Sequence, residues 1–511
     1  MRPILKPGQN CWNIFDTWET GILIDTRAYF QAFYHTAKQA RHYILLAGWQ
    51  FDSGVYLLRG EDKKNVDGKI QFLPFLNSLC LNNPDLKIYI LAWDFAFVFT
   101  FSREWFQKWI FNWNSSKNLY FRFDSAHPIG ASHHQKFVVI DGVIAFVGGI
   151  DISFNRWDDV DHLTKNPYRK NIEGISYEPY HDIQAYGTGP IANYLADFFK
   201  IRWKLSGGGK INLPPPYKEN KFKIETGITI FSQKIAVSRT QAESLVPPIL
   251  ASVNEIRNLY IDAIEASEEI IYIENQYFSS HAVYQALINR MRTKNRPSLQ
   301  IVIILPRGLH TTSEIISIGS TQANMLHCLT EVASRYRHSL GIYYTESRGV
   351  KKVPVYIHAK LLLIDDIFLS VGSANINNRS MGLDTEMNMN WEVTSKNNLT
   401  FINSIKNCRV NLLAEHTNIK NVTELSRLGQ IKGLVAYLDQ IADSRKYSLR
   451  HHSTKAYDND IRCPDGIEPK LILLDPKEPV VDENIYELMS RDKNSFFVKG
   501  ITLLSELLEK F

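Results

Sequence analysis

The chain has 511 residues, of which 44% are hydrophobic and 22% charged, with a formal net charge of +5. This composition is ordinary for a soluble globular protein, and the length is sufficient for two large domains or one two-lobed domain. No stretch approaches the roughly 20 apolar residues of a transmembrane helix, and the N-terminus lacks the apolar core of a signal peptide. We therefore expect a protein that is cytoplasmic or exported without a signal peptide, and peripheral at membranes.

The five cysteines are scattered along the chain, at Cys11, Cys80, Cys328, Cys408 and Cys463. Their odd number and the lack of a CxxC spacing argue against a disulfide framework and against a structural zinc site built from cysteines. This pattern favours a reducing compartment.

The first 205 residues alternate helices and strands. Asp25 can cap a helix whose apolar residues recur at helical spacing up to residue 40. Strands are expected over residues 43–48, 86–93 and 119–123, and helices over 70–81 and 103–113. A strand, a tight Asp141-Gly142 turn and a second strand follow. A strand near 180–186 and an amphipathic helix from 190 to about 205 complete this part.

After a linker rich in glycine and proline, SGGGKINLPPP, the order starts again. Helices are expected over 255–266, 282–292, a segment that ends near 337, and 399–415. Strands are expected over 269–274, 299–305, 342–345 and 386–393. We expect a first lobe over 1–205, a linker over 206–247, a second lobe over 248–416 and a C-terminal extension over 417–511. The extension has one expected helix, over 501–510.

A motif of the form HxKxxxxD occurs once in each half of the chain. The first copy is His134, Lys136 and Asp141, and the second is His358, Lys360 and Asp365. The two histidines lie 224 residues apart, and Gln50 and Gln276 lie 226 apart, so a whole unit is duplicated. We predict an α/β fold of two pseudo-symmetric αβα lobes, each with a mixed or mostly parallel sheet flanked by helices, and a site at the lobe interface.

In a strand, residues i and i+2 point to the same face, so each histidine shares a face with its lysine. The aspartates Asp141 and Asp365 have the opposite parity and are expected to hold the hairpin turn. A lysine beside each histidine repels a cation, so we expect no metal and no cofactor at this site. A phosphate suits two lysines and two histidines, because neutral histidine can attack phosphorus and protonated histidine can supply a proton.

The duplicated motifs, with Gly-Gly or Gly-Ser seven residues after each Asp, resemble those of the phospholipase D superfamily. The segments SHHQKFVVID, FVGGIDIS with the following NRWD, YHDIQAYGTGP, IYIENQYF and GSANINNRSM are similar, in the same order, to the phosphatidylcholine-hydrolysing branch shared by bacteria and eukaryotes. The resemblance covers roughly residues 7 to 416.

The resemblance implies a role for each matching residue. His134 would be the nucleophile that forms a phosphohistidine, and His358 the general acid and then the general base. The two motifs as a whole are the catalytic candidates: His134, Lys136, Asp141, His358, Lys360 and Asp365. The candidates for contact with the phosphate are Asn375, its counterpart Asp151, and the small residues Gly148, Gly149, Gly372 and Ser373.

Two acidic residues, Asp182 and Glu386, match the carboxylates that orient the catalytic histidines in the family. Which carboxylate serves which histidine stays open, and Asp182 could also be an ordinary polar strand residue. The glycines could equally serve strand twist or a bulge.

The resemblance implies a phospholipase D that releases phosphatidic acid and a free head group, with transfer to a primary alcohol as a side reaction. The alternatives are a phospholipid-synthesising phosphatidyltransferase, as in cardiolipin synthases, and a nuclease of the same superfamily. The expected partner is a phospholipid at a membrane surface, with no nucleic acid, for a monomeric protein. The aromatic stretch over 93–113 could form a membrane-touching rim, although core packing is favoured.

Overall fold

The computed structural model describes residues 3–64, 66–94, 110–111, 115–128, 130–216, 222–244, 249–309, 318–454 and 475. The expected helix over 501–510 lies outside these residues, as does nearly all of the aromatic stretch with the helix expected over 103–113. None of the helices in the described ranges combines the length and the apolar character needed to cross a bilayer.

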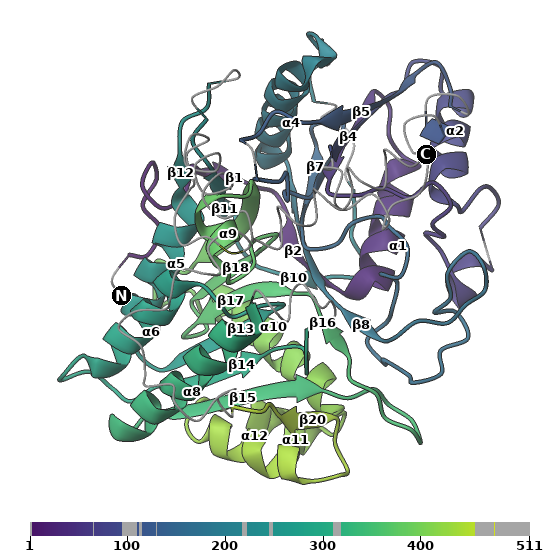
Figure 1. Ribbon diagram of the computed structural model, residues 1–511. Helices are drawn as coiled ribbons and strands as arrows, with labels where there is room; N and C mark the ends of the chain where they lie inside the picture. The colour runs from purple at the N-terminus through teal and green to yellow at the C-terminus, as the bar shows by residue number, and fades with distance from the viewer. Residues whose placement is uncertain are drawn as a thin grey trace, which may run out of the picture.

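Two large β-sheets form the frame of the molecule (Figure 1). The first has the order β10 (Ile228–Thr229), β2 (Thr20–Ile24), β9 (Ile183–Thr188), β7 (Ile144–Gly148), β6 (Phe137–Ile140), β3 (Tyr43–Gly48), β4 (Lys87–Trp93), β5 (Leu119–Asp124). The second has the order β1 (Asn13–Asp16), β11 (Lys234–Gln241), β19 (Glu386–Glu392), β18 (Phe368–Gly372), β17 (Lys360–Ile364), β13 (Ile270–Asn275), β14 (Gln300–Ile304), β15 (Ser339–Thr345), β20 (Leu449–His451), with β12 (Val253–Asn254) beside β11.

The two sheets repeat one topology. The run β9-β7-β6-β3-β4-β5 corresponds in order and direction to β19-β18-β17-β13-β14-β15. In each run the last three strands are parallel, and the hairpin strands are antiparallel to their neighbours. The sheets are therefore mixed, and the duplication predicted from the motif spacing extends to the whole lobe.

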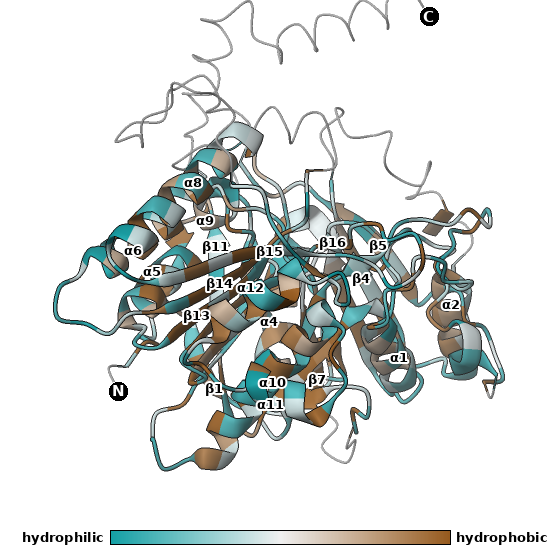
Figure 2. Cartoon of the chain, turned by 90° about the horizontal axis from the view of Figure 1, so that it is seen from below, coloured by the Kyte–Doolittle hydropathy of each residue, from teal (hydrophilic) through white to brown (hydrophobic). Residues whose placement is uncertain are grey.

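Helices cover the outer face of each sheet, and the inner faces pack against each other. Figure 2 shows helices with apolar residues toward the sheets and polar residues outward. The first sheet is covered by α1 (Asp25–Ala37) and α2 (Phe72–Asn82), and the second by α5 (Glu255–Ala266), α6 (His281–Arg292) and α8 (Ser320–Arg335). The direct contact between the inner faces is made by β7 and β9 with β18 and β19, whereas α4 (Pro190–Trp203) lies against β6, β7 and β9, and α10 (Leu399–Thr417) against β10 and β15.

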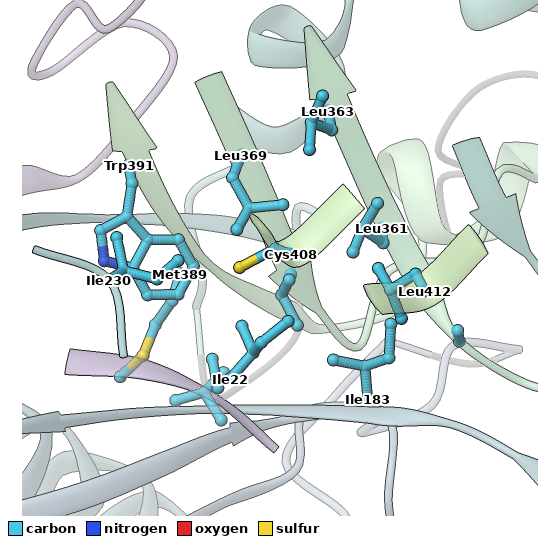
Figure 3. Close-up of a cluster of buried hydrophobic side chains, with 14 of the residues drawn as sticks. Ile22, Ile183, Ile230, Leu361, Leu363, Leu369, Met389, Trp391, Cys408 and Leu412 are labelled. Atoms are coloured by element: carbon cyan, nitrogen blue, oxygen red, sulfur yellow. The ribbon is translucent and has the colours of Figure 1, made fainter. Parts of the chain in front are cut away.

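One hydrophobic cluster joins the two lobes (Figure 3). Ile22 and Ile183 come from the first sheet, Leu369 and Met389 from the second, and Leu412 from α10. All five side chains are fully buried. Burial of apolar surface on this scale stabilises the lobe interface, at roughly 25 cal/mol per Å² removed from water.

The expected division of the chain differs from the structure in three places. The linker expected over 206–247 contains β10, which pairs with β2 of the first sheet, and β11, which lies inside the second sheet. The N-terminal strand β1 pairs with β11 and so belongs to the second sheet, although it was placed in the first lobe. The extension continues beyond 417 with α11 (Val422–Leu428), α12 (Leu434–Asp443) and β20, which pairs with β15.

Two smaller expectations concern the cysteines and the start of α1. Cys11, Cys80 and Cys408 are free and buried, whereas Cys328 is disulfide-bonded. Asp25 does not cap α1, because Ile24 holds the N-cap position and no side chain caps the helix there. Asp25 has a left-handed backbone (φ 64°), and its carboxylate lies near His181.

Candidate active site

The two HxK segments lie where the lobes meet. His134 and Lys136 precede β6, and the backbone N–H of His134 donates to Thr385 O of the second lobe at 3.0 Å. His358 precedes β17 and follows the short strand β16 (Tyr356–Ile357). This strand pairs in parallel with β8 (Tyr180–His181) of the first lobe. Each motif is thus fixed against backbone of the opposite lobe.

His134 is oriented by a carboxylate from the second lobe. Nδ1 of His134 lies 2.9 Å and 3.0 Å from the two carboxylate oxygens of Glu386. Ser380 Oγ donates to Oε1 of Glu386 at 2.6 Å, and Ser373 Oγ donates to Oε2. Both hydroxyl groups hold the carboxylate in place. Among the residues that the structure describes, Nε2 of His134 has no hydrogen-bond partner, so this nitrogen can meet a ligand.

His358 is oriented by a carboxylate from the first lobe. Its Nδ1 lies 2.6 Å from Oδ2 of Asp182, which is completely buried. The backbone N–H of His358 donates to the carbonyl oxygen of His181 at 2.8 Å. The pairing that the sequence leaves open is therefore crossed: each lobe supplies the carboxylate for the other lobe's histidine.

The ionisation of the first pair favours a nucleophile. Burial, with the charges of Lys136 and Lys360, holds the pKa of His134 well below its usual value of 6.5. Burial raises the pKa of Glu386, but the hydrogen bonds from Ser373 and Ser380 and the charge of Lys136 oppose this rise and favour the carboxylate, which accepts the Nδ1 proton of His134. The imidazole of His134 therefore stays neutral at neutral pH, with a nitrogen lone pair free to attack.

The second pair shows the same pattern. Burial, followed by the charge of Lys360, lowers the pKa of His358 well below 6.5. Burial raises the pKa of Asp182 to about 7, although the charge of Lys360 opposes it. A bound anion would raise the pKa of His358, because negative charge favours the imidazolium form. His358 is thus suited to take up a proton when a phosphate binds.

The two lysines have different neighbours. Lys136 pairs with Asp151 at 3.2 Å, whereas Lys360 donates to Oε1 of Gln276 at 3.2 Å. Burial lowers the pKa of Lys360 to about 7, against the opposing charge of Asp182. Lys360 is completely buried and Lys136 nearly so. Buried cations without a full set of counter-charges favour an anionic ligand.

Asp151 and Asn375 occupy equivalent positions but differ in their contacts. Asp151 accepts the backbone N–H of Trp49 at 2.9 Å besides pairing with Lys136. Asn375 is buried, and its Oδ1 has no hydrogen-bond partner among the described residues. The two halves of the site are therefore not equivalent, and the Asn375 amide is the one available to a ligand.

The small residues after each motif make room for neighbouring side chains. A Cβ on Gly149 would lie 2.3 Å from Oδ1 of Asp182. A Cβ on Gly148 would meet Gln184, and one on Gly372 would meet Asn388, at 2.3 Å and 2.1 Å. Gly149 thus allows the close approach of the orienting Asp182, whereas Gly148 and Gly372 make room for the neighbouring strands β9 and β19. Contact of these glycines with a phosphate stays a prediction.

Asp141 and Asp365 lie at the far ends of β6 and β17 from the histidines. The Asp141 carboxylate accepts the backbone N–H groups of residues 41, 42 and 43 at 2.7–2.9 Å. Asp365 accepts those of residues 268, 269 and 270 at 2.7–2.8 Å. Both anchor the hairpin tip to the start of the adjacent strand and have no place near the histidines, which corrects their grouping with the catalytic residues.

Several site residues have no role in the sequence analysis. The Arg156 guanidinium lies over the Tyr180 ring at 5.2 Å, and that ring lies 5.4 Å from His358. Gln276 donates to Tyr356 OH at 2.7 Å. Arg156 and Gln276 both stand in segments that carry the family resemblance, but one sequence does not distinguish a site residue from its neighbours in such a segment.

Two family models and several curated relatives match this chain. The family model described as "Phospholipase D" matches residues 113–294, and that described as "Cardiolipin synthase, PLD-like domain" matches residues 260–407. Phospholipase D alpha 3 of Arabidopsis thaliana is 22% identical over 75% of this chain and 62% of its own length. Phospholipase D A of Dictyostelium discoideum is 24% identical over 70% of this chain and 32% of its own. The chain thus spans less than two thirds of these relatives.

A crystal structure of another protein has the same fold as this chain. The crystal structure of phosphatidylserine synthase from Haemophilus influenzae Rd KW20 superposes with a TM-score of 0.51 and 13% identity, over 84% of this chain and 94% of that one. At this identity the likeness concerns the fold alone. The family statement rests on the two family models, which together match residues 113–407, and on the relatives: over these residues the chain belongs to the phospholipase D superfamily.

Proposed function

We propose that the protein is a phospholipase D that hydrolyses phosphatidylcholine-like phospholipids to phosphatidic acid and a free head group. The observation that carries this proposal is the crossed arrangement, with His134 on Glu386 and His358 on Asp182. It provides one imidazole for attack and one for proton transfer, and lysine amines for the phosphate between them. The names of the Arabidopsis and Dictyostelium relatives support the substrate class.

In the first step, Nε2 of His134 attacks phosphorus and the bond from phosphorus to the head-group oxygen breaks. The Nε2 proton of His358 passes to that oxygen, which leaves as an alcohol. The proton on Nδ1 of His134 stays hydrogen-bonded to Glu386, which stabilises the positive charge on the imidazole. This assignment uses the low pKa of His134.

In the second step, neutral His358 takes a proton from water, and the hydroxide attacks phosphorus. The P–N bond breaks, phosphatidic acid leaves, and both histidines return to their first state. A primary alcohol in place of water gives a phosphatidyl alcohol by the same step. Lys136, Lys360 and Asn375 would hold the phosphoryl oxygens in both steps.

We assign Arg156 to the same phosphate, because it is a further cation beside His358 and contributes to the low pKa of that histidine. The reaction takes place at a membrane surface, where the protein is peripheral and monomeric.

The test uses vesicles of phosphatidylcholine and the wild-type chain. Choline and phosphatidic acid should be released by wild type and by His35→Ala, which changes an exposed histidine on α1. His134→Ala should release neither. A primary alcohol should divert part of the product to the phosphatidyl alcohol.

Two other outcomes would overturn the proposal. Phosphatidyl transfer to an alcohol with no hydrolysis would assign the protein to the phospholipid-synthesising transferases, which the second family description favours. Cleavage of DNA with no action on vesicles would assign it to the nucleases of the superfamily.

A further inference from the structure

A second cluster of ionisable side chains lies buried beside Asp182. Asp25, His162, His181 and Glu415 each offer one ligand atom, and these atoms lie within 4.8 Å of one another. They come from the start of α1, the loop between β7 and β8, strand β8 itself, and α10. All four side chains are buried, and none belongs to the HxKxxxxD motifs.

The four groups converge on a common centre. Oε1 of Glu415 is 2.6 Å from Nδ1 of His181 and 2.9 Å from Nε2 of His162. Oδ1 of Asp25 is 3.1 Å from the same His181 nitrogen, and Oδ2 is 3.5 Å from the same His162 nitrogen. Donors at 2.0–2.2 Å around a tetrahedral ion lie about 3.4 Å apart. Because the four ligand atoms lie within 4.8 Å of one another, an ion requires each separation to change by no more than about 1.5 Å.

The second ring nitrogen of each imidazole, which is directed away from the cluster, lies beside a further carboxylate. Nδ1 of His162 lies 2.9 Å from Oδ2 of Asp158, and Nε2 of His181 lies 2.8 Å from Oε2 of Glu274. Metal-binding histidines usually donate their second ring nitrogen to such a group, which fixes the tautomer and leaves the other nitrogen free for the ion.

A second observation is independent of these contacts. Oδ2 of Asp25 is buried and accepts no hydrogen bond from any residue that the structure describes. Its nearest charged neighbour is the inward nitrogen of His162. A completely buried carboxylate oxygen without a donor is unusual, and this one is directed into the cluster.

We propose that Asp25, His162, His181 and Glu415 bind a divalent transition metal ion of the zinc class. Two imidazole nitrogens with two carboxylate oxygens suit zinc, whereas calcium and magnesium prefer oxygen ligands alone. The two carboxylates balance the charge of the ion. With four protein ligands the coordination is closed, so the ion is structural and takes no part in the reaction.

The ion would fix the point between β8 and β9 where Asp182 lies. The backbone N–H of Asp182 donates to Oδ1 of Asp25 at 3.3 Å, and the N–H of Asp25 donates to Asp182 O at 2.8 Å. Glu415 comes from the second lobe and ties α10 to this point. A role in holding Asp182 against His358 rests on the proposed function, but binding of the ion does not.

The test measures metal in the full chain without an affinity tag. After incubation with zinc chloride and exhaustive dialysis, elemental analysis should find about one zinc ion per chain. Cobalt in its place should give the visible absorption bands of a tetrahedral site. Zinc returned to the stripped protein should raise its melting temperature, because a ligand that binds only the native state stabilises it.

His162→Gln should lose the zinc, whereas His133→Gln should retain it. His133 is the matched control, because it is a buried histidine beside a carboxylate, Asp124, at 3.2 Å and outside the cluster. If His162→Gln fails to fold, the cobalt spectrum of the wild-type chain still shows whether a tetrahedral metal site is present.

A wild-type chain that retains no zinc or cobalt, with a melting temperature unchanged by either ion, would overturn the site. The cluster would then consist of protonated imidazoles paired with carboxylates. Equal zinc in wild type and His162→Gln would also overturn it. Choline release is a separate readout, so a chain that binds zinc but does not act on vesicles would leave this site standing and refute only the proposed function.

Discussion

Nδ1 of His134 lies 2.9 Å from Oε1 of Glu386, a residue 252 positions further along the chain. The histidine precedes a strand of the first sheet, and the carboxylate begins a strand of the second. In the other pair, the second lobe supplies His358 and the first lobe supplies Asp182, so neither lobe holds a complete site. Both lobes must fold and dock before either histidine is oriented.

Glu386→Gln should lower kcat by roughly 10²–10⁴-fold, which is the usual contribution of an oriented proton-transfer group to the rate. The amide can hold the ring in the wrong tautomer and cannot balance a positive imidazole. Glu392→Gln is the control, because Glu392 lies on the same strand but accepts the backbone N–H groups of Ile4 and Leu5. Equal kcat for the two variants would show that Glu386 does not act through His134.

Asp141→Asn should lower stability by about 1–3 kcal/mol, because one buried donor loses its acceptor. The amide keeps Oδ1 for His42 and Tyr43 but turns an NH₂ group toward the N–H of Arg41. Asparagine tolerates the left-handed backbone at this position (φ 52°), so the change isolates the hydrogen bond. Melting temperatures measure the effect, with His134→Asn as a control that should melt like wild type. Equal melting of wild type and Asp141→Asn would contradict the anchoring role.

The acid limb of kcat/KM should lie below pH 6.5. The pKa of His134 is held well below 6.5 by burial and by the neighbouring lysines, so the nucleophile is lost by protonation only at lower pH. A bis(p-nitrophenyl) phosphate substrate reports this ionisation, because its leaving group needs no proton from His358. A midpoint at or above pH 6.5 would mean that the imidazole titrates like an exposed one.

Gly149→Ala should reduce activity sharply with little change in KM. The added Cβ would lie 2.3 Å from Oδ1 of Asp182, and that carboxylate would have to move away from His358. Gly308→Ala is the control, because a Cβ there meets no atom within 4 Å. Wild-type kcat in Gly149→Ala would show that the orientation of His358 does not depend on this close approach.

Much of the fold was open to sequence reasoning because strongly periodic segments dominate it. Strand β3 and helix α5 begin and end where the sequence predicts, and the duplicated hairpins are strands β6, β7, β17 and β18. Strands β1 and β11 were missed, because each depends on pairing with a distant segment. Local pattern does not report such long-range pairing.

The site was predicted as a set of residues but not as an arrangement. The motif spacing identifies His134 and His358, and strand parity separates Asp141 from them. The crossed pairing with Glu386 and Asp182 follows from how the lobes dock, which no spacing encodes. The cluster of Asp25, His162, His181 and Glu415 was invisible for the same reason, since its members are spread over 390 residues.

We propose that His134 is the nucleophile of a site completed by His358. The direct measurement is a burst of p-nitrophenol from bis(p-nitrophenyl) phosphate, followed by mass spectrometry of the protein quenched in base. His358→Ala should release about one p-nitrophenol per chain and carry the phosphoryl adduct on His134, because attack proceeds while water is not activated. An adduct on any other residue, or an equal burst from His134→Ala, would contradict the account.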